Sequence, residues 1–312
     1  MPSIRPLRRS SQSAQSNAMP DSAIFCPLCL KNNAMRVGSL AAAEIVESFR
    51  ANFAIDTSPY FAGIETVHIC ECRLTGYRYF TPLNLGANAQ LYEELGTRPW
   101  YYESNKWEFS TVDQYVQTGT RVLEVGCGNG ALYKAISATK DIDYTGLELT
   151  AHNGTEVRII QETIEEHAER EIRYDAVCAF QVLEHVADVH SFLTACIGCL
   201  AANAPLIIGV PNNAGYVGLS QNALNMPPHH MGLWKKYSLE RLPKVFPEIR
   251  HVATLFDPTT HPGLSDAPVI EHFYRKWLIP KAMTFKFLHA FILPRWVRSK
   301  TVVAVFRKRE PK

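Results

Sequence analysis

The sequence contains no apolar stretch long enough to cross a membrane and no internal repeat. A membrane-spanning helix needs about 18 uninterrupted apolar residues. The nearest approach, residues 277–297, is broken by Lys281, Lys286, His289, Arg295 and two prolines. A membrane-spanning protein and a repeat architecture are therefore not expected.

A strong net charge is also missing, since the 312 residues carry a formal charge of only +2. The charge is unevenly distributed, because residues 271–312 hold eleven Lys and Arg against two Glu. This positive charge is confined to one segment and no recognised binding module accompanies it. Nucleic-acid binding is therefore disfavoured.

No secretory signal is expected, because residues 1–22 are basic and rich in Ser but have no apolar core. We expect them to form a disordered leader. The cysteines do not form the pattern of a disulfide framework either, since four are closely paired near the N-terminus and four lie within apolar patterns. They indicate a metal site plus buried thiols in a reducing, cytoplasmic location. The eight are Cys26, Cys29, Cys70, Cys72, Cys127, Cys178, Cys196 and Cys199.

The chain is long enough to bury one full core and a smaller module, with 46% hydrophobic residues. After the leader, residues 23–82 are turn-rich and bear cysteines, which indicates a small β module. Residues 83–119 have helical spacing and form a linker or lid. Residues 120–312 form the main domain, with an insertion at about 258–299.

From Arg121 onward, apolar runs alternate with amphipathic stretches, which predicts an α/β fold with a parallel sheet. The helices of this part are expected at 131–138, 163–170, 189–201 and 238–245. The predicted strands are "RVLEV", "DYTGLEL", "EVRIIQ", "YDAVCAF", "APLIIGV", "RHVATLF" and "TVVAVF".

The segment "VLEVGCGNG" places three glycines directly behind a predicted strand. Such a turn lets the backbone approach a nucleoside cofactor closely. The spacing of Gly126, Gly128 and Gly130 differs from the dinucleotide fingerprint. Glu124 would repel a pyrophosphate but suits a ligand with an ammonium and a sulfonium group. Glu148, at the end of the next strand, can accept ribose hydroxyls in either cofactor class.

Four motifs in order, "VLEVGCGNG", "GLEL", "YDAVCAFQVLEHV" and "PLIIGVPNN", resemble the class I S-adenosylmethionine-dependent methyltransferases. The similarity is to their ubiquinone-biosynthesis-like branch, and it covers about residues 100–255 plus the final strand. It implies a Rossmann-like seven-stranded sheet with helices on both faces and an antiparallel last strand. The cofactor would lie over the carboxyl ends of the first strands.

The resemblance also implies roles for individual residues. Glu124, Gly126 and Gly128 would hold the methionine end of S-adenosylmethionine, and Glu148 the ribose. Glu162 would contact the adenine, and Gln181 would line the cofactor pocket. Together with Gly130 of the turn, the cofactor-binding residues are thus Glu124, Gly126, Gly128, Gly130, Glu148, Glu162 and Gln181.

Methyl transfer is an in-line displacement, so the protein mainly aligns the reactants and removes a proton. The candidate bases are His185 in "LEHV" and the pair His229 and His230 in "NMPPHHMGLW". His185 falls at the carboxyl edge of the sheet, where it either removes the proton or only fixes the loop. The His229–His230 pair forms either a wall of the acceptor pocket or a structural turn.

The segment "CPLC" at 26–29 is half of a zinc site, because two thiolates spaced by two residues can bind one tetrahedral ion. The downstream "HICECRLTGYRYFTP" resembles the zinc knuckle that precedes some methyltransferase domains, notably sugar C-methyltransferases. The family's first cysteine matches Cys72, but its second falls on Thr75, a poor zinc ligand.

We therefore predict a structural zinc at Cys26, Cys29, Cys70 and Cys72, with His68 as the alternative to Cys70. A degenerate knuckle that has lost its metal is the other interpretation. A catalytic zinc is disfavoured.

Two further segments combine aromatic and charged residues. Tyr101, Tyr102 and Trp107 precede the first strand of the main domain, where they either cover the ligand or pack a lead-in helix. Residues 268–300 interleave aromatics with Lys and Arg. They form a lid helix, a peripheral membrane contact or a site for an anionic substrate.

The sequence therefore predicts an S-adenosylmethionine-dependent methyltransferase that acts on an oxygen or carbon of a small-molecule acceptor. Sugar, quinone-like and lipid-linked acceptors all remain open. The alternatives are an NAD-dependent oxidoreductase, disfavoured by Glu124 and the glycine spacing, and an inactive methyltransferase-fold scaffold.

Overall fold

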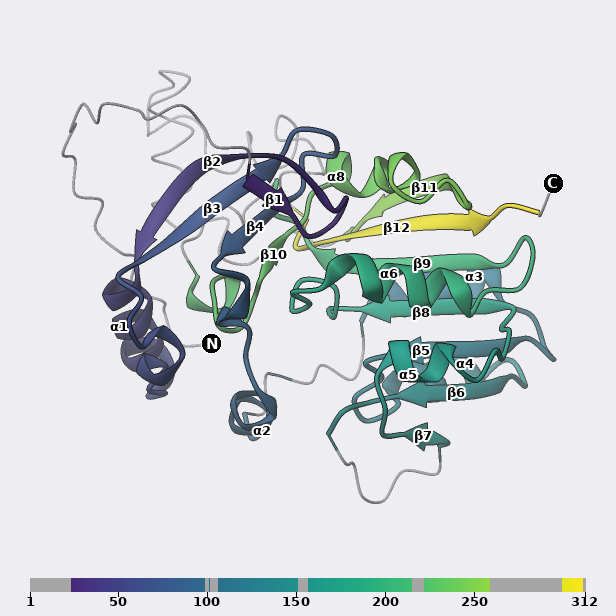
Figure 1. Cartoon of the computed structure of the whole chain (residues 1–312). Coiled ribbons are helices and arrows are strands. Elements are labelled where there is room, and N and C mark those ends of the chain that lie inside the picture. The colour runs from purple at the N-terminus through teal and green to yellow at the C-terminus, as the bar shows by residue number, and fades with distance from the viewer. Residues whose placement is uncertain are drawn as a thin grey trace, which may run out of the picture.

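The computed structural model describes residues 24–98, 101, 106–150, 157–214, 222–258 and 299–310. Two β-sheets and the helices that cover them make up this part of the chain (Figure 1). The predicted leader and nearly all of the predicted insertion at 258–299 lie outside it. Among the described residues, no helix has the length and apolar character that a membrane crossing requires.

The larger sheet has seven strands in the order β11-β12-β9-β8-β5-β6-β7. Strands β9, β8, β5, β6 and β7 are mutually parallel, and β12 runs antiparallel to both β9 and β11. This confirms the predicted Rossmann-like sheet with its antiparallel last strand. The strands are β5 (Arg121–Val125), β6 (Asp143–Leu147), β7 (Ile159–Ile160), β8 (Ala176–Phe180), β9 (Pro205–Pro211), β11 (Ile249–Phe256) and β12 (Thr301–Lys308).

Alternating side chains of the central strands face two separate cores, because successive residues of a strand point to opposite sides. On one face, Val122, Cys178 and Ile207 pack against helices α3 (Glu108–Tyr115) and α4 (Ala131–Ser137). The strands are apolar on both faces for this reason, as expected of a parallel sheet covered on each side.

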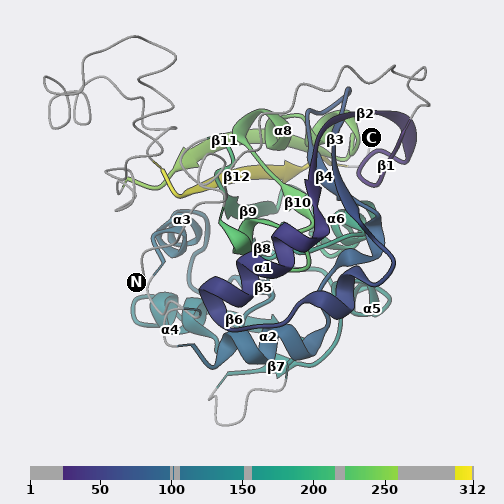
Figure 2. The same cartoon turned by 90° about the vertical axis from the view of Figure 1, so that its left-hand side faces the viewer.

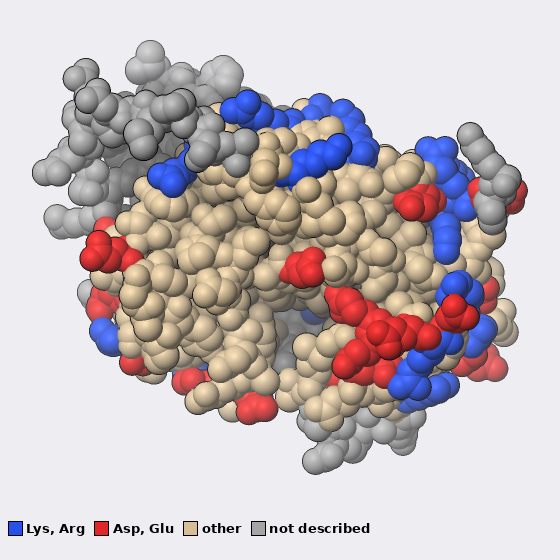
Figure 3. Space-filling view, viewed as in Figure 1, with Lys and Arg blue, Asp and Glu red and all other residues tan. Residues whose placement is uncertain are grey.

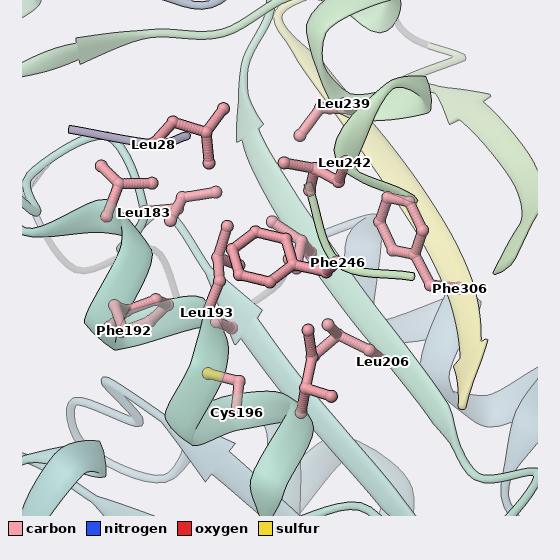
Figure 4. Close-up of a cluster of buried hydrophobic side chains, with 14 of the residues drawn as sticks. Leu28, Leu183, Phe192, Leu193, Cys196, Leu206, Leu239, Leu242, Phe246 and Phe306 are labelled. Carbon is pink, nitrogen blue, oxygen red and sulfur yellow. The ribbon is translucent and has the colours of Figure 1, made fainter. Parts of the chain in front are cut away.

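On the other face, Leu123 and Leu206 pack against helices α5 (Ile164–Ala168), α6 (Val189–Gly198) and α8 (Lys236–Glu240). Figure 4 shows this core, with side chains from helix, strand and loop interdigitating around Phe246. Short 3-10 turns occur at η1 (Ser58–Phe61), η2 (Leu83–Leu85), η3 (Ala223–Asn225) and η4 (Leu242–Lys244).

The smaller sheet is antiparallel and has the order β1-β2-β3-β4-β10. Its last strand comes from the 120–312 part of the chain, so the 23–82 segment does not complete its own sheet. The module also contains a 12-residue helix, α1 (Ala42–Phe53), where only strands and turns were expected. The strands are β1 (Ile24–Cys26), β2 (Lys31–Ala41), β3 (Thr66–Cys72), β4 (Arg78–Thr81) and β10 (Gly232–Leu233).

The N-terminal module lies over the carboxyl ends of the parallel strands. In Figure 2, α1 and helix α2 (Ala89–Gly96) stand in front of these strand ends. Leu28 of the module packs in the same core as Leu183 (Figure 4), and the Trp234 ring stacks on Tyr77 at 4.2 Å. The module therefore closes the edge of the sheet at which a cofactor is expected.

Candidate active site

A cavity of about 960 Å³ lies at the carboxyl edge of the large sheet. Its walls come from the ends of β5 and β6, the loop after β8, helix α2 and the 222–230 segment. Figure 3 shows the molecule hollowed between its left-hand and lower right-hand parts, with Asp and Glu side chains gathered on the right-hand rim. Six of the seven predicted cofactor residues and all three predicted bases line this cavity.

The glycine turn after β5 adopts backbone angles that L side chains rarely take. Gly126 has φ +70° and Gly130 has φ +74°, and both lie in the left-handed region that favours glycine. A Cβ added at Gly126 would come within 2.4 Å of Val182 Cγ2. The turn therefore needs glycine both for its conformation and for its close approach to the loop after β8.

Glu124 is buried at the end of β5, where its carboxyl group accepts a hydrogen bond from the Tyr144 hydroxyl. Burial removes water from the carboxyl and raises the pKa of Glu124 to about 8. At neutral pH, Glu124 is mainly protonated while the cavity holds no cation. The sequence predicted a fixed negative charge here, but Glu124 would become charged only when a cation binds beside it. An arriving cation would favour ionisation of the Glu124 carboxyl group.

Glu148 lies at the mouth of the cavity, immediately after β6. Its carboxylate accepts hydrogen bonds from the backbone N–H of Gly128, at 2.9 Å, and of Leu149, at 2.8 Å. These bonds tie the tip of the glycine turn to the next strand and fix the orientation of the carboxylate.

Glu162 also lines the cavity, but side chains already engage both of its carboxylate oxygens. His167 Nδ1 bonds to one oxygen and the Arg170 guanidinium donates to the other. His167 Nε2 in turn bonds to the Tyr174 hydroxyl at 2.8 Å. The carboxylate is therefore held rigidly at the rim where the resemblance locates an adenine contact.

Gln181 has the left-handed φ of +59° directly after β8. Its backbone N–H donates to the Gly209 carbonyl at 2.8 Å, and its side-chain amide donates to Glu108 Oε1 at 3.1 Å. Glu108 lines the same cavity and is buried, and burial raises the pKa of its carboxyl. Sequence reasoning missed Glu108, because nothing distinguishes it from other acidic residues at helix N-termini.

The three predicted bases come together from two loops. One ring nitrogen of each of His185, His229 and His230 lies within 4.8 Å of the others. His185 Nδ1 is 2.7 Å from the His229 carbonyl oxygen, and His229 Nδ1 is 2.8 Å from that of Leu224. His230 Nδ1 is 3.2 Å from Asn225 Oδ1. Each Nδ1 therefore carries the proton, and each Nε2 keeps a lone pair.

These histidines are neutral at physiological pH. Burial lowers the pKa of His185 to about 4, and burial also lowers the pKa values of His229 and His230 well below the ordinary value. The Tyr101 hydroxyl lies 2.9 Å from His229 Nε2. The Tyr92 ring meets His185 edge-on at 5.4 Å. Neutral imidazoles of this kind can accept a proton or bind a metal ion.

Glu184 is a second residue whose importance the sequence did not reveal. It is only 1% exposed, and its Oε2 has no hydrogen-bond partner. Its Oε1 lies 3.9 Å from His185 Nε2, and burial raises the pKa of Glu184 to about 8.

Of the predicted linker aromatics, Tyr101 and Trp107 line the cavity, whereas Tyr102 lies outside the described residues.

A second cluster forms in the N-terminal module. The thiols of Cys26, Cys29 and Cys72 are buried and lie within 4.8 Å of one another. Asn33 Oδ1 accepts from Cys29 Sγ at 3.4 Å and from Cys72 Sγ at 3.5 Å. The thiol of Cys26 donates to Cys72 and lowers the pKa of Cys72 to about 5. Three sulfur atoms, one of them readily ionised, fit three corners of a tetrahedral zinc site.

Cys70, expected as the fourth ligand, does not belong to this cluster. Its Sγ lies 3.8 Å from Thr81 Oγ1 instead. Cys70 and Cys72 both lie on β3, but only the Cys72 thiol joins those of Cys26 and Cys29. The alternative, His68, lies a further two residues back on the same strand. All eight cysteines are buried and none forms a disulfide; the sequence predicted buried thiols for Cys127, Cys178, Cys196 and Cys199.

Comparisons with known proteins agree with this geometry. A family model described as a methyltransferase domain matches residues 97–260. The ubiquinone biosynthesis O-methyltransferase of Salmonella paratyphi A is 33% identical over 109 residues, which cover 31% of this chain and 45% of that protein. The chain thus matches slightly less than half the length of this curated relative. A solved S-adenosylmethionine-dependent methyltransferase from Archaeoglobus fulgidus has the same fold, with a TM-score of 0.52 and 15% identity over 71% of this chain and 100% of that one. The chain therefore belongs to the class I S-adenosylmethionine-dependent methyltransferases.

Proposed function

We propose that this methyltransferase transfers the methyl group to an oxygen or carbon of a small-molecule acceptor bound beside the histidines. The observation that carries the proposal is that a single cavity contains both the glycine turn and the three neutral histidines. In this proposal the cofactor occupies the glycine-turn end. Glu124, Gly126 and Gly128 hold its methionine part, Glu148 the ribose and Glu162 the adenine, while Gln181 lines the pocket.

In the transfer step, the acceptor's nucleophilic atom attacks the methyl carbon of the sulfonium. A bond from the acceptor to carbon forms as the carbon–sulfur bond breaks, and the sulfur keeps the electron pair to give S-adenosylhomocysteine. The acceptor's proton passes to an Nε2 lone pair of the histidine cluster. Neutral imidazoles suit this role, because a protonated one has no lone pair to offer.

The acceptor class stays within sugar, quinone-like and lipid-linked molecules. Three aromatic side chains, Tyr92, Tyr101 and Trp107, line the cavity and favour an acceptor with a flat ring. The curated relative acts in ubiquinone biosynthesis by its name, which also favours a ring-bearing acceptor.

The experiment replaces two of the three histidines with alanine, in the variants His229→Ala and His230→Ala. S-adenosylhomocysteine binding, measured by calorimetry, should change less than about twofold. Transfer of a labelled methyl group to a panel of phenolic, sugar and lipid-linked acceptors should fall by about 10² or more, as expected when a general base is lost. His251→Ala is the matched control, since His251 lies on β11 outside the cavity lining.

Weakened cofactor binding in both histidine variants would assign these residues to the fold instead of the chemistry. Binding of NAD in place of S-adenosylhomocysteine would overturn the proposal altogether.

We also propose a structural zinc held by Cys26, Cys29 and Cys72. The clustered thiols support it, and Asn33 or a water molecule would supply the fourth ligand. A reducing, cytoplasmic location remains a prediction that the free, buried thiols support.

A further inference from the structure

The three cavity histidines share a feature that a general base alone does not require. Each donates its Nδ1–H to a carbonyl oxygen, two of the backbone and one of an amide side chain. Metal-ligating histidines typically have such a partner, because it fixes the tautomer and directs the opposite nitrogen toward the ion. A single base would need only one ring oriented in this way.

We propose that His185, His229 and His230 bind one divalent transition-metal ion at the acceptor end of the cavity. One ring nitrogen of each histidine lies within 4.8 Å of the others. A tetrahedral ion with nitrogen ligands at about 2.1 Å separates its nitrogens by roughly 3.4 Å. Binding would therefore require these nitrogens to approach one another by at most roughly 1.4 Å.

Glu184 supplies an independent observation. Its side chain is buried, one of its carboxylate oxygens lacks a hydrogen-bond partner, and the other faces His185 at 3.9 Å. A buried carboxyl oxygen without a hydrogen-bond partner is costly in a folded protein. A cation bound at His185 would give this carboxyl group an electrostatic partner.

The donor set also defines the class of ion. Neutral imidazoles favour zinc, iron, nickel and copper over magnesium and calcium, which prefer oxygen ligands. Three protein ligands leave a fourth position open, as in catalytic zinc sites. The Tyr101 hydroxyl, now bonded to His229 Nε2, would yield that nitrogen to the ion.

This inference rests on the proposed function, because it concerns the acceptor end of the same cavity. With the ion bound, the Nε2 lone pairs are occupied, so the ion would replace the histidine base by polarising the acceptor's oxygen, and the proton of that oxygen would leave to solvent. It narrows the acceptor to one with an oxygen atom, which would occupy the fourth position of the ion. An aliphatic carbon acceptor would have no group to place there.

The test uses the untagged full chain, stripped of metal with a chelator and titrated with Co²⁺. Cobalt bound to thiolates gives an intense sulfur-to-metal charge-transfer absorption, which imidazole ligands do not give, so the two clusters are distinguishable. We expect His230→Phe to bind one fewer Co²⁺ per chain than the wild type and to keep its sulfur absorption. Cys29→Ser should also bind one fewer Co²⁺ per chain, but it should lose the sulfur absorption. In wild-type Co²⁺ protein, proton NMR should show three exchangeable, paramagnetically shifted Nδ1–H signals, one for each ligand.

Equal Co²⁺ stoichiometry in the wild type and His230→Phe, or the absence of the shifted imidazole signals, would overturn the inference. The NMR measurement decides the question even where the variant fails to fold. S-adenosylhomocysteine binding is measured on the same samples. If it persists without histidine-bound cobalt, only the metal site fails, whereas its loss in the wild type would count against the proposed function.

Discussion

At the scale of single residues, Glu124 has the most consequential environment. Its pKa of about 8 means that most of the carboxyl is protonated at pH 7. A bound ammonium or sulfonium favours the ionised form, so binding of S-adenosylhomocysteine should release a proton below pH 8. We expect the affinity to rise between pH 6 and pH 8 by up to about tenfold per pH unit and then to level off. Calorimetry in buffers of different ionisation enthalpy measures both the affinity and the proton release.

Glu124→Gln should remove this pH dependence and weaken binding above pH 8. Glu184→Gln is the matched control, since Glu184 has the same raised pKa of about 8 but faces the histidines. An unchanged pH profile in Glu124→Gln would show that Glu124 does not meet the cofactor's positive charge.

Gly126 offers a second test at this scale. Gly126→Ala places a side chain at φ +70° and brings its Cβ within 2.4 Å of Val182. We expect a loss of stability of about 1–3 kcal/mol from the backbone conformation and a large loss of cofactor affinity. Gly119→Ala is the control, because Gly119 has φ +86° with no atom within 4 Å of the added Cβ. Chemical denaturation should show a larger loss of stability for Gly126→Ala, because only that Cβ meets Val182. Calorimetry should show that cofactor affinity is lost only at Gly126.

At the scale of secondary-structure elements, strand β3 contributes Cys72 to the cysteine cluster but does not contribute Cys70. Cys29→Ser should abolish metal binding by the thiols and lower the stability of the chain by at least about 2 kcal/mol, since metal binding contributes to folding free energy. Cys70→Ser, a change at another buried thiol, should leave the thiol-bound metal in place. Metal analysis and thermal unfolding of both variants measure the difference. Loss of the metal in Cys70→Ser would contradict the described cluster.

The larger sheet was predictable because its signals are local. Strand β5 occupies the predicted residues, and the other strands differ from the prediction only at their ends. Strand β10 could not be predicted, because its two residues form a strand only by pairing with Tyr79 and Arg78, far away in the sequence. Helix α1 was missed because the surrounding turns and cysteines suggested a β module, although Ile45 and Phe49 have helical spacing.

Sequence motifs pointed to individual residues that line the cavity, but not to their arrangement. Sequence motifs identified His185 and the His229–His230 pair separately, whereas their mutual contact arises from two loops that meet only in the folded chain. The buried carboxyls Glu108 and Glu184 carry no sequence signal, because burial is a property of the tertiary structure. The protonation of Glu124 could not be predicted for the same reason.

At the scale of the whole molecule, residues of both sheets pack together in one of the hydrophobic clusters. Leu28 of the N-terminal module is fully buried against residues of the large sheet and its helices (Figure 4). We therefore expect both parts to unfold in a single cooperative transition. Leu28→Ala should destabilise both by about 2–5 kcal/mol, the usual cost of truncating a buried leucine.

Hydrogen exchange at increasing denaturant, followed separately for β3 and β8, measures this coupling. Leu30→Ala is the matched control, since Leu30 is 51% exposed and its truncation should change stability by less than about 0.5 kcal/mol. If β3 opens well before β8 in the wild type, the parts are independent.

The position of β10 has a consequence for how this enzyme could be re-engineered or diversified by recombination. The segment that carries His229 and His230 runs directly into the strand that completes the N-terminal sheet. A chimera that exchanged only the first 82 residues for those of another methyltransferase would leave β10 to pair with an edge strand of a different sequence. Grafts intended to change acceptor preference should therefore exchange residues 222–234 together with the N-terminal module.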